Sequence, residues 1–166
     1  GDVTLGGEHY LRDDPASFAS VYAANGPAYF FANFADFFAE DDLTIVNLEG
    51  VLTDNDQLPP MDKGKGTSAG DGYWFRGSTE YVQVLTSSSV EAVSLANNHA
   101  LDYGPAGLRD TIATLDEAGV AWFGTRDKHA DETEKFFFYE KDGVTVAFVS
   151  LYWEDYLQGD PDGCGA

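Results

Sequence analysis

The sequence has few basic residues. Only 9 lysine and arginine residues stand against 29 aspartate and glutamate residues, which gives a formal net charge of −20 at pH 7. This charge repels nucleic acid and anionic membrane surfaces, so neither is expected as a partner. It is compatible with a secreted or cell-surface protein, with cation binding and with a salt-tolerant host.

Cysteine and long apolar runs are also scarce. Cys164 is the only cysteine, which excludes an internal disulfide and suits the cytoplasm and a bacterial exterior equally. No apolar run is long enough to span a bilayer, and no signal peptide opens the sequence. Since the sequence begins at Gly1 within a predicted strand, a leader or an anchor could precede it.

The apolar residues present are sufficient for a sizeable core in a chain of 166 residues. Asp142 and Gly143 separate two β-rich runs near the end, and this dipeptide is a strong hairpin signal. Short apolar segments predict strands at 2–6, 43–48, 91–96, 120–123, 135–140 and 144–151.

One stretch, 105–118, carries a full set of helix signals. Pro105 suits the first helical position, and Gly119 suits the C-terminal cap. The apolar stripe expected to face the core consists of Leu108, Ile112 and Leu115.

Two further helices are predicted, over 29–38 and, with weaker periodicity, over 79–86. In the first, four side chains at helical spacing share one face: Phe30, Phe34, Phe37 and Phe38. Strands and helices alternate through most of the chain, which favours an α/β layered fold with a substantially parallel sheet.

Two segments lack any periodicity. Residues 50–72 are polar and predict a long flexible loop, and residues 157–166 predict a flexible tail. We expect the whole chain, residues 1–166, to form a single domain.

Polar side chains lie within or directly after three predicted strands. In parallel α/β sheets ligands bind at the carboxyl edge of the strands, where residues distant in sequence meet. Carboxylates, amide oxygens and an imidazole form a ligand set for Mn, Mg, Fe or Zn. A turn alone would explain one asparagine but hardly the whole group after the third strand. The candidates are Asp2, Asn47, Glu49, Asn97, Asn98 and His99.

These residue types also have ordinary structural roles. A strand-end asparagine usually caps a helix or a turn, and a lone histidine is more often structural than catalytic. His9 and His129 are expected to be structural, because nothing polar clusters around them. Asp102 is expected to serve the turn that enters the next helix. Residues 73–75 are aromatic and belong to the core or line a pocket beside the long loop.

Several segments resemble a known family in order and spacing. They are "GDVTLGG", "DLTIVNLEG", "VEAVSLANNHALDYGPAGLRDTIATLDEAGV" and "FGT" followed by "GVTVAFVSL". Together they resemble the CapA family of bacterial capsule-synthesis proteins, which is associated with poly-γ-glutamate capsule. The resemblance implies a fold similar to calcineurin-like metallophosphoesterases, a layered α/β sandwich with helices packed on a mixed sheet.

The resemblance also implies metal ligands. Asp2 resembles the aspartate of the first metal motif, although Thr4 stands where its histidine partner is expected. Glu49 resembles the carboxylate that bridges metals, and Asn98 resembles the asparagine ligand. The implied cofactor is a divalent metal.

The same resemblance assigns chemistry to the remaining candidates. His99 is similar to the histidine that steadies or protonates a phosphate-like oxygen. Asn47 and Asn97 are similar to residues that contact the substrate or support the ligands.

The sequence departs from the family in lacking its later His-Trp-Gly and Gly-His-His-Pro-His segments. The chain therefore resembles the N-terminal part of a family domain, either a truncated piece or a short homologue. Half of the expected metal ligands are missing, so we expect weak metal binding.

The function implied by the resemblance is capsule or poly-γ-glutamate biosynthesis, at the extracellular face of the bacterial membrane or after secretion. Its activity would be metal-dependent hydrolysis, with the anionic polymer or polymer-synthesis membrane proteins as partners. One alternative is a non-catalytic binding or assembly component of polymer export. Another is a metallophosphoesterase for other phosphate esters. A polyglutamate would be repelled by this chain unless cations or a local basic patch intervened.

Overall fold

The computed structural model of the chain describes residues 1–62, 73–125 and 135–152. A four-stranded parallel sheet lies at its centre. In spatial order its strands are β1 (Asp2–Val3), β3 (Ile45–Leu48), β6 (Ala92–Ser94) and β7 (Ala121–Phe123). The predicted α/β fold and the strand positions are confirmed, each strand being shorter than its apolar run.

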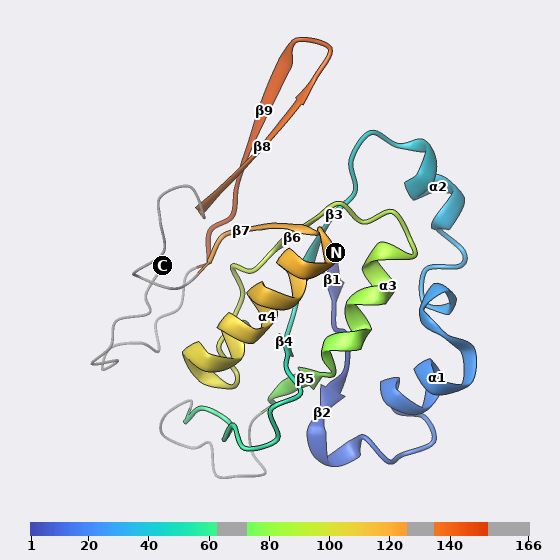
Figure 1. Cartoon of the computed structure of the whole chain (residues 1–166), viewed down its shortest axis with the longest axis vertical. Helices are drawn as coiled ribbons and strands as arrows, with labels where there is room; N and C mark the ends of the chain where they lie inside the picture. The colour runs from blue at the N-terminus through green and yellow to red at the C-terminus, as the bar shows by residue number, and fades with distance from the viewer. Residues whose placement is uncertain (63–72, 126–134, 153–166) are drawn as a thin grey trace.

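The two faces of this sheet differ. Val46 pairs with Val93, and both are buried on one face of the sheet. The helices α3 (Gln83–Thr86) and α4 (Gly104–Ala118) cover this face (Figure 1). Asn47 pairs with Asp2 on one side and with Ser94 on the other, so these three side chains share the opposite face. The register thereby places the polar candidates of β1 and β3 together.

A smaller sheet continues from the ends of β1 and β3. It consists of β2 (Gly7–Glu8), β5 (Phe75–Gly77) and β4 (Val51–Leu52), with β5 in the middle. The predicted flexible loop over 50–72 is therefore wrong at its start, where β4 pairs with β5. Residues 63–72 and the predicted tail at 157–166 lie outside the described residues.

The passage from β1 to β2 requires glycine. Gly6 has φ +131°, and a Cβ there would lie 2.2 Å from the carbonyl oxygen of Arg76. Only a residue without a side chain lets the two backbones approach this closely.

The longest helix is α4 (Gly104–Ala118), as predicted over 105–118. Gly119 ends it in the left-handed conformation, with φ +71°. Leu108 and Leu115 are 2% and 0% exposed, and Ile112 packs against the same core while half-buried. The helix predicted over 79–86 is also present, as the 3₁₀ turn η3 (Thr79–Val82) followed by α3 (Gln83–Thr86).

The aromatic segment near the N-terminus is not one helix. A short 3₁₀ turn, η2 (Pro27–Tyr29), is separated from α2 (Ala35–Glu40), so the helix predicted over 29–38 is confirmed only at 35–38. Phe30 stacks on Phe18 at 4.3 Å between ring centroids, whereas Phe37 is 70% exposed. Some of the aromatic side chains therefore pack in the core and others lie at the surface. The apolar face of a single helix would place all of them in the same environment.

Two elements precede that segment. They are the 3₁₀ turn η1 (His9–Leu11) and α1 (Phe18–Asn25), and the sequence reasoning did not predict either. Ser17 caps α1 by accepting a hydrogen bond from the Ser20 N–H at 3.1 Å.

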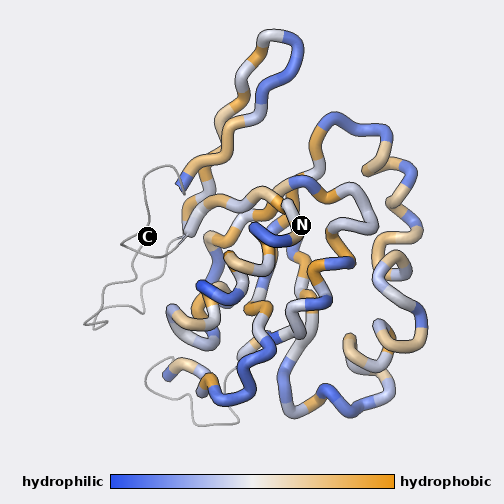
Figure 2. The backbone as a smooth tube through the Cα atoms, in the orientation of Figure 1, coloured by the Kyte–Doolittle hydropathy of each residue, from blue (hydrophilic) through white to orange (hydrophobic). Residues whose placement is uncertain are grey.

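The chain's last described strands form the predicted hairpin, β8 (Phe136–Lys141) with β9 (Val144–Val149). Asp142 and Gly143 both have positive φ, as a two-residue hairpin turn demands. The hairpin extends away from the sheet, with apolar strands and a polar tip (Figures 1 and 2). Phe137 anchors its base by stacking on Phe123 of β7.

Among the described residues, no helix has the length and apolarity needed to cross a membrane.

Replacing Leu115 by Ala is expected to lower the free energy of unfolding by about 2–5 kcal/mol, because the side chain is fully buried and leaves a cavity. Urea titration followed by circular dichroism measures the loss. Glu117→Ala, on the exposed side of α4, is the control and should change stability by less than about 0.5 kcal/mol. Equal stability of the two variants would contradict the assignment of the core.

Candidate functional site

A chain of side-chain hydrogen bonds runs across three strands of the central sheet. Asn47 Nδ2 donates to Asp2 Oδ1 at 2.8 Å, and Asn97 Nδ2 donates to Asn47 Oδ1 at 3.0 Å. Asn97 Nδ2 also donates to the Leu48 carbonyl at 2.9 Å. Asn97 is only 4% exposed, so its amide locks the loop after β6 onto the end of β3.

The same asparagine positions the next residues. Its Oδ1 accepts the backbone N–H of His99 at 2.9 Å, the two-residue spacing of an Asx turn. The two adjacent asparagines therefore differ in role. Asn97 forms the turn, whereas Asn98 is the next residue and its side chain is half-buried.

His99 is held on two sides. Its Nδ1 lies 2.7 Å from Asp102 Oδ2, and its ring stacks on Phe75 at 4.1 Å between centroids. A carboxylate can only accept a hydrogen bond, so Nδ1 carries the proton. The ring's Nε2 is then an acceptor when His99 is neutral and a donor when it is protonated.

Asp102 has a larger role than the local turn expected from sequence. The residue is 0% exposed, and its Oδ2 also accepts the Phe75 N–H at 2.6 Å. It joins His99, three residues earlier, to β5, which is distant in sequence. The three-residue spacing of His99 and Asp102 is the one feature of the sequence that indicates this pair. The contact of Asp102 with β5 could not be predicted, because the sequence does not give the position of β5.

Glu49 and Asn98 lie at the same edge of the sheet. The Glu49 N–H donates to the Val3 carbonyl at 2.9 Å, which places it beyond the paired ends of β1 and β3. Both residues are half-buried, and neither side chain makes a hydrogen bond within residues 1–62, 73–125 and 135–152. Their polar atoms are therefore available to a bound group.

These residues do not fit a complete metal centre. The described part of the chain contains no group of three or more His, Cys, Asp or Glu side chains placed to hold a metal ion. The candidate donors are mostly oxygens, and one ring nitrogen of His99 is committed to Asp102. Such a set fits at most a loosely held hard cation such as Mg or Mn.

The other sequence predictions at histidine and aromatic positions have mixed outcomes. His9 is not isolated, because Arg12 Nη1 lies 2.7 Å from its Nε2, and His129 lies outside the described residues. Of the aromatic residues at 73–75, Phe75 supports His99, and Trp74 Nε1 donates to the Met61 carbonyl at 2.8 Å. Tyr73 is 66% exposed and is not a core residue.

Comparison with known proteins shows one family over nearly the whole chain. The family model for "Bacterial capsule synthesis protein PGA_cap" matches residues 1–163. Over 128 residues the chain is 27% identical to the capsule biosynthesis protein CapA of Bacillus anthracis, which covers 76% of this chain and 29% of that protein.

Two other relatives match shorter stretches. The PGA biosynthesis protein CapA of Bacillus subtilis (strain 168) is 32% identical over 72 residues, 43% of this chain and 19% of that protein. A probable polyglutamine synthesis accessory protein of Mycobacterium tuberculosis (strain CDC 1551 / Oshkosh) is 31% identical over 83 residues, 50% of this chain and 20% of that protein. The matches thus span less than a third of these relatives.

Replacing Asp102 by Ala is expected to end the preference of His99 for a proton on Nδ1, because no carboxylate then accepts a hydrogen bond from that nitrogen. Long-range ¹H–¹⁵N NMR at neutral pH reports the tautomer, and the sequence has only three histidines to assign. Stability should fall by about 1.5–3 kcal/mol, the value of a hydrogen bond to a buried charge. Asp36→Ala on exposed α2 is the control, and an unchanged tautomer in Asp102→Ala would refute the pairing.

Calorimetric titration of the chain with Mn²⁺ and Zn²⁺ is expected to give weak binding, with Kd of about 10⁻⁴ M or weaker, because the site offers few fixed ligands. Glu49→Gln should weaken Mn²⁺ binding further, whereas Glu117→Gln on the exposed side of α4 should not. Tight stoichiometric Zn²⁺ binding, with turnover of a chromogenic phosphodiester that His99→Ala abolishes, would show a complete site instead.

Proposed function

This chain belongs to the bacterial capsule synthesis protein family PGA_cap, which matches it over residues 1–163, and we propose that it acts in making a poly-γ-glutamate capsule. The proposed place of action is the polar edge formed by Asp2, Asn47, Glu49, Asn97, Asn98 and His99. The proposed location is the extracellular face of the bacterial membrane, where a capsule polymer emerges.

The observation that carries the proposal is the fixed geometry of His99. Asn97 sets its backbone, Asp102 sets its tautomer, and Phe75 covers one face of its ring. Within the described residues its Nε2 has no hydrogen-bonding partner. A side chain oriented this closely and left with one open polar atom is arranged to meet a ligand.

In the proposal, His99 donates a hydrogen bond or a proton from Nε2 to an oxygen of the substrate. Asn47 and Asn97 hold the edge in place, and Glu49 and Asn98 face the bound group. A −20 chain repels a glutamate polymer, so a loosely bound divalent cation at Asp2, Glu49 and Asn98 would neutralise the contact.

A non-catalytic role in polymer binding or assembly is the second candidate. It is favoured by the absence of a group of three metal-ligating acids or histidines in the part of the chain described. The two roles differ in one respect, because only a hydrolytic role shortens the polymer. Partners in the assembly role would be the membrane proteins that synthesise the polymer.

The test is a His99→Ala change in the gene that encodes this chain, in a bacterium that forms the capsule. Cell-associated polyglutamate, measured as glutamate after hydrolysis of purified capsule, should fall about tenfold or more. Glu117→Gln is the control, and an immunoblot checks that both proteins accumulate. A normal amount of capsule with normal protein would reject the proposal.

Polymer length distinguishes the two roles in the same strains. A hydrolytic role predicts longer chains in the His99→Ala strain than in the parent, whereas an assembly role predicts fewer chains of unchanged length. Gel filtration of the purified capsule measures both quantities.

A further inference from the structure

A cavity of about 610 Å³ lies between the turn at η1, the start of α1 and the small sheet β2–β5–β4. This volume is in the range of small-molecule sites. None of the residues of the proposed His99 site lines it. The side walls are aromatic, from Phe18 and Tyr81, and the polar groups include two arginines, Arg12 and Arg76.

Arg76 is the central polar group of this cavity. It is next to Phe75 on β5, and successive residues of a strand point to opposite sides. Phe75 therefore meets His99 on one side, while Arg76 lines the cavity on the other. Its side chain is only 6% exposed, so its charge must be paired.

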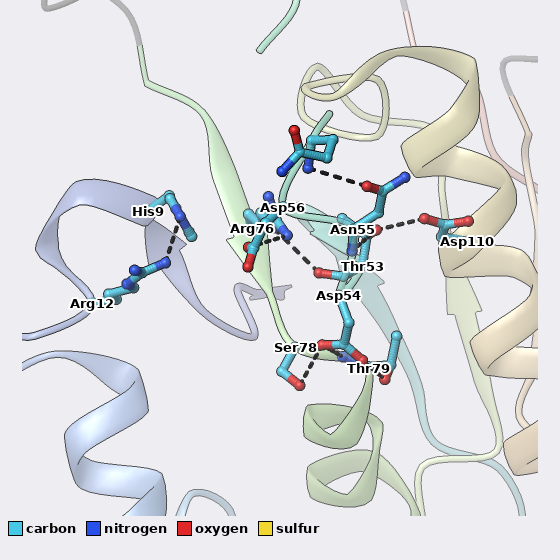
Figure 3. A network of polar contacts seen from close by, with 11 residues as sticks. His9, Arg12, Thr53, Asp54, Asn55, Asp56, Arg76, Ser78, Thr79 and Asp110 are labelled. Carbon is cyan, nitrogen blue, oxygen red and sulfur yellow. Dashed lines mark hydrogen bonds and ion pairs between the residues drawn. The ribbon is translucent and has the colours of Figure 1, made fainter. Parts of the chain in front are cut away.

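The hydrogen-bonding partners of Arg76 come from the residues that follow β4 (Figure 3). Its Nε donates to the Thr53 carbonyl at 3.2 Å, and its Nη2 donates to Asp56 Oδ1 at 2.9 Å. Its guanidinium also lies 5.5 Å from the centre of the Tyr103 ring. Backbone and aromatic contacts fix the guanidinium, and the Asp56 carboxylate supplies the counter-charge.

The two acids nearest to Arg76 are held differently. Asp54 accepts hydrogen bonds from Ser78 and Thr79; burial acts to raise its pKa, but these bonds and Arg76 outweigh it and lower the pKa. Asp56 has a side chain that is 68% exposed, and its one hydrogen bond among the described residues is to Arg76. Asp54 is thus fixed in place, whereas the exposed Asp56 side chain can exchange with another carboxylate that keeps Arg76 paired.

A second cationic group faces the same cavity. Arg12 Nη1 donates to His9 Nε2 at 2.7 Å, and Figure 3 shows this pair on the turn facing β5. Burial, together with the charges of Arg12 and Arg76, lowers the pKa of His9, so the ring is neutral at pH 7 and accepts. Two of the chain's 9 basic residues therefore converge on one cavity in a protein of net charge −20.

We propose that this cavity binds the carboxylate of a glutamyl residue, which replaces the Asp56 carboxylate on Arg76. In the structure Asp56 occupies the position proposed for the ligand and keeps the buried guanidinium paired. The planar guanidinium matches a carboxylate, and Arg12 adds a second positive charge at the mouth. Four acids also line the cavity, Glu8, Asp13, Asp54 and Asp56. A single carboxylate that takes the place of Asp56 leaves the charge paired with Arg76 unchanged, whereas a dianionic phosphate adds a negative charge beside the other acids.

The competition with Asp56 implies weak binding of a single glutamate and stronger binding of a polymer. Each carboxylate of a polyglutamate can take the same place, so rebinding of neighbouring units raises the overall affinity. The choice of a γ-linked polymer as the ligand rests on the proposed function, whereas the carboxylate site itself does not.

The experiment titrates the full chain by calorimetry with a γ-linked glutamate oligomer, an α-linked one, a glutamine oligomer and inorganic phosphate. Both glutamate oligomers should bind, and the glutamine oligomer and phosphate should not. Arg76→Gln should weaken binding about tenfold or more. Arg109→Gln, an exposed arginine on α4 with the same change of charge, is the control and should bind as the parent does.

Asp56→Asn gives a result of the opposite sign. Because the competing carboxylate is lost, this variant should bind the glutamate oligomers about two- to fivefold more tightly than the parent. It lies on an exposed segment and tests the proposal even where Arg76→Gln fails to fold. Unchanged or weaker binding by Asp56→Asn, or equal weakening by Arg109→Gln, would overturn the proposal.

The outcome is independent of the test of the proposed function. Absent binding beside a capsule that His99→Ala reduces would reject this site and leave the proposed function standing. Binding with the predicted variant pattern beside a capsule unaffected by His99→Ala would support this site and reject the role of the His99 edge.

Discussion

Asp102 joins its own turn to two segments that are distant in sequence, through its buried carboxylate and its backbone carbonyl. Its Oδ2 receives Nδ1 of His99 and the N–H of Phe75, and its backbone carbonyl receives the N–H of Met61 at 2.8 Å. A fully buried acid is stable only when it is paired and hydrogen-bonded. The turn before α4, strand β5 and the segment after β4 are therefore held in one arrangement, with Asp102 at its centre.

Strand β5 separates two polar environments, the surroundings of His99 and the cavity lined by Arg76. Phe75 completes the surroundings of His99, and Arg76, on the other side of the strand, lines the cavity beside α1. Because adjacent residues of one short strand serve both, a shift of β5 would disturb the two together. The polar edge at His99 and the cavity at Arg76 therefore both depend on the position of this one strand.

Local signals account well for the regular elements. Alternation and apolar runs located the parallel strands, Pro105 and Gly119 bracketed α4, and Asp142-Gly143 located the hairpin, because each depends on near neighbours in sequence. Prediction was wrong where tertiary packing overrides periodicity. The phenylalanines over 29–38 suit one helix, but Phe30 stacks on Phe18 and the helix is interrupted. Strands β4 and β5 were not predicted, because a strand of two or three residues is too short to show an alternating pattern of apolar and polar residues.

The sequence alone determined the residue types at the carboxyl edge and the order in which they occur, because strand ends in a parallel sheet converge whatever the packing. It gave Asn47, Asn97 and His99 as neighbours; the Asn47–Asp2 hydrogen bond follows from the register of β1 and β3, and the Asn97–His99 bond is a local turn after β6. Only the tertiary structure decided the roles of Asp102 and of Arg76 with Asp56. Those contacts span 27 residues from Asp102 to Phe75 and 20 from Arg76 to Asp56, and burial rather than local pattern selects them.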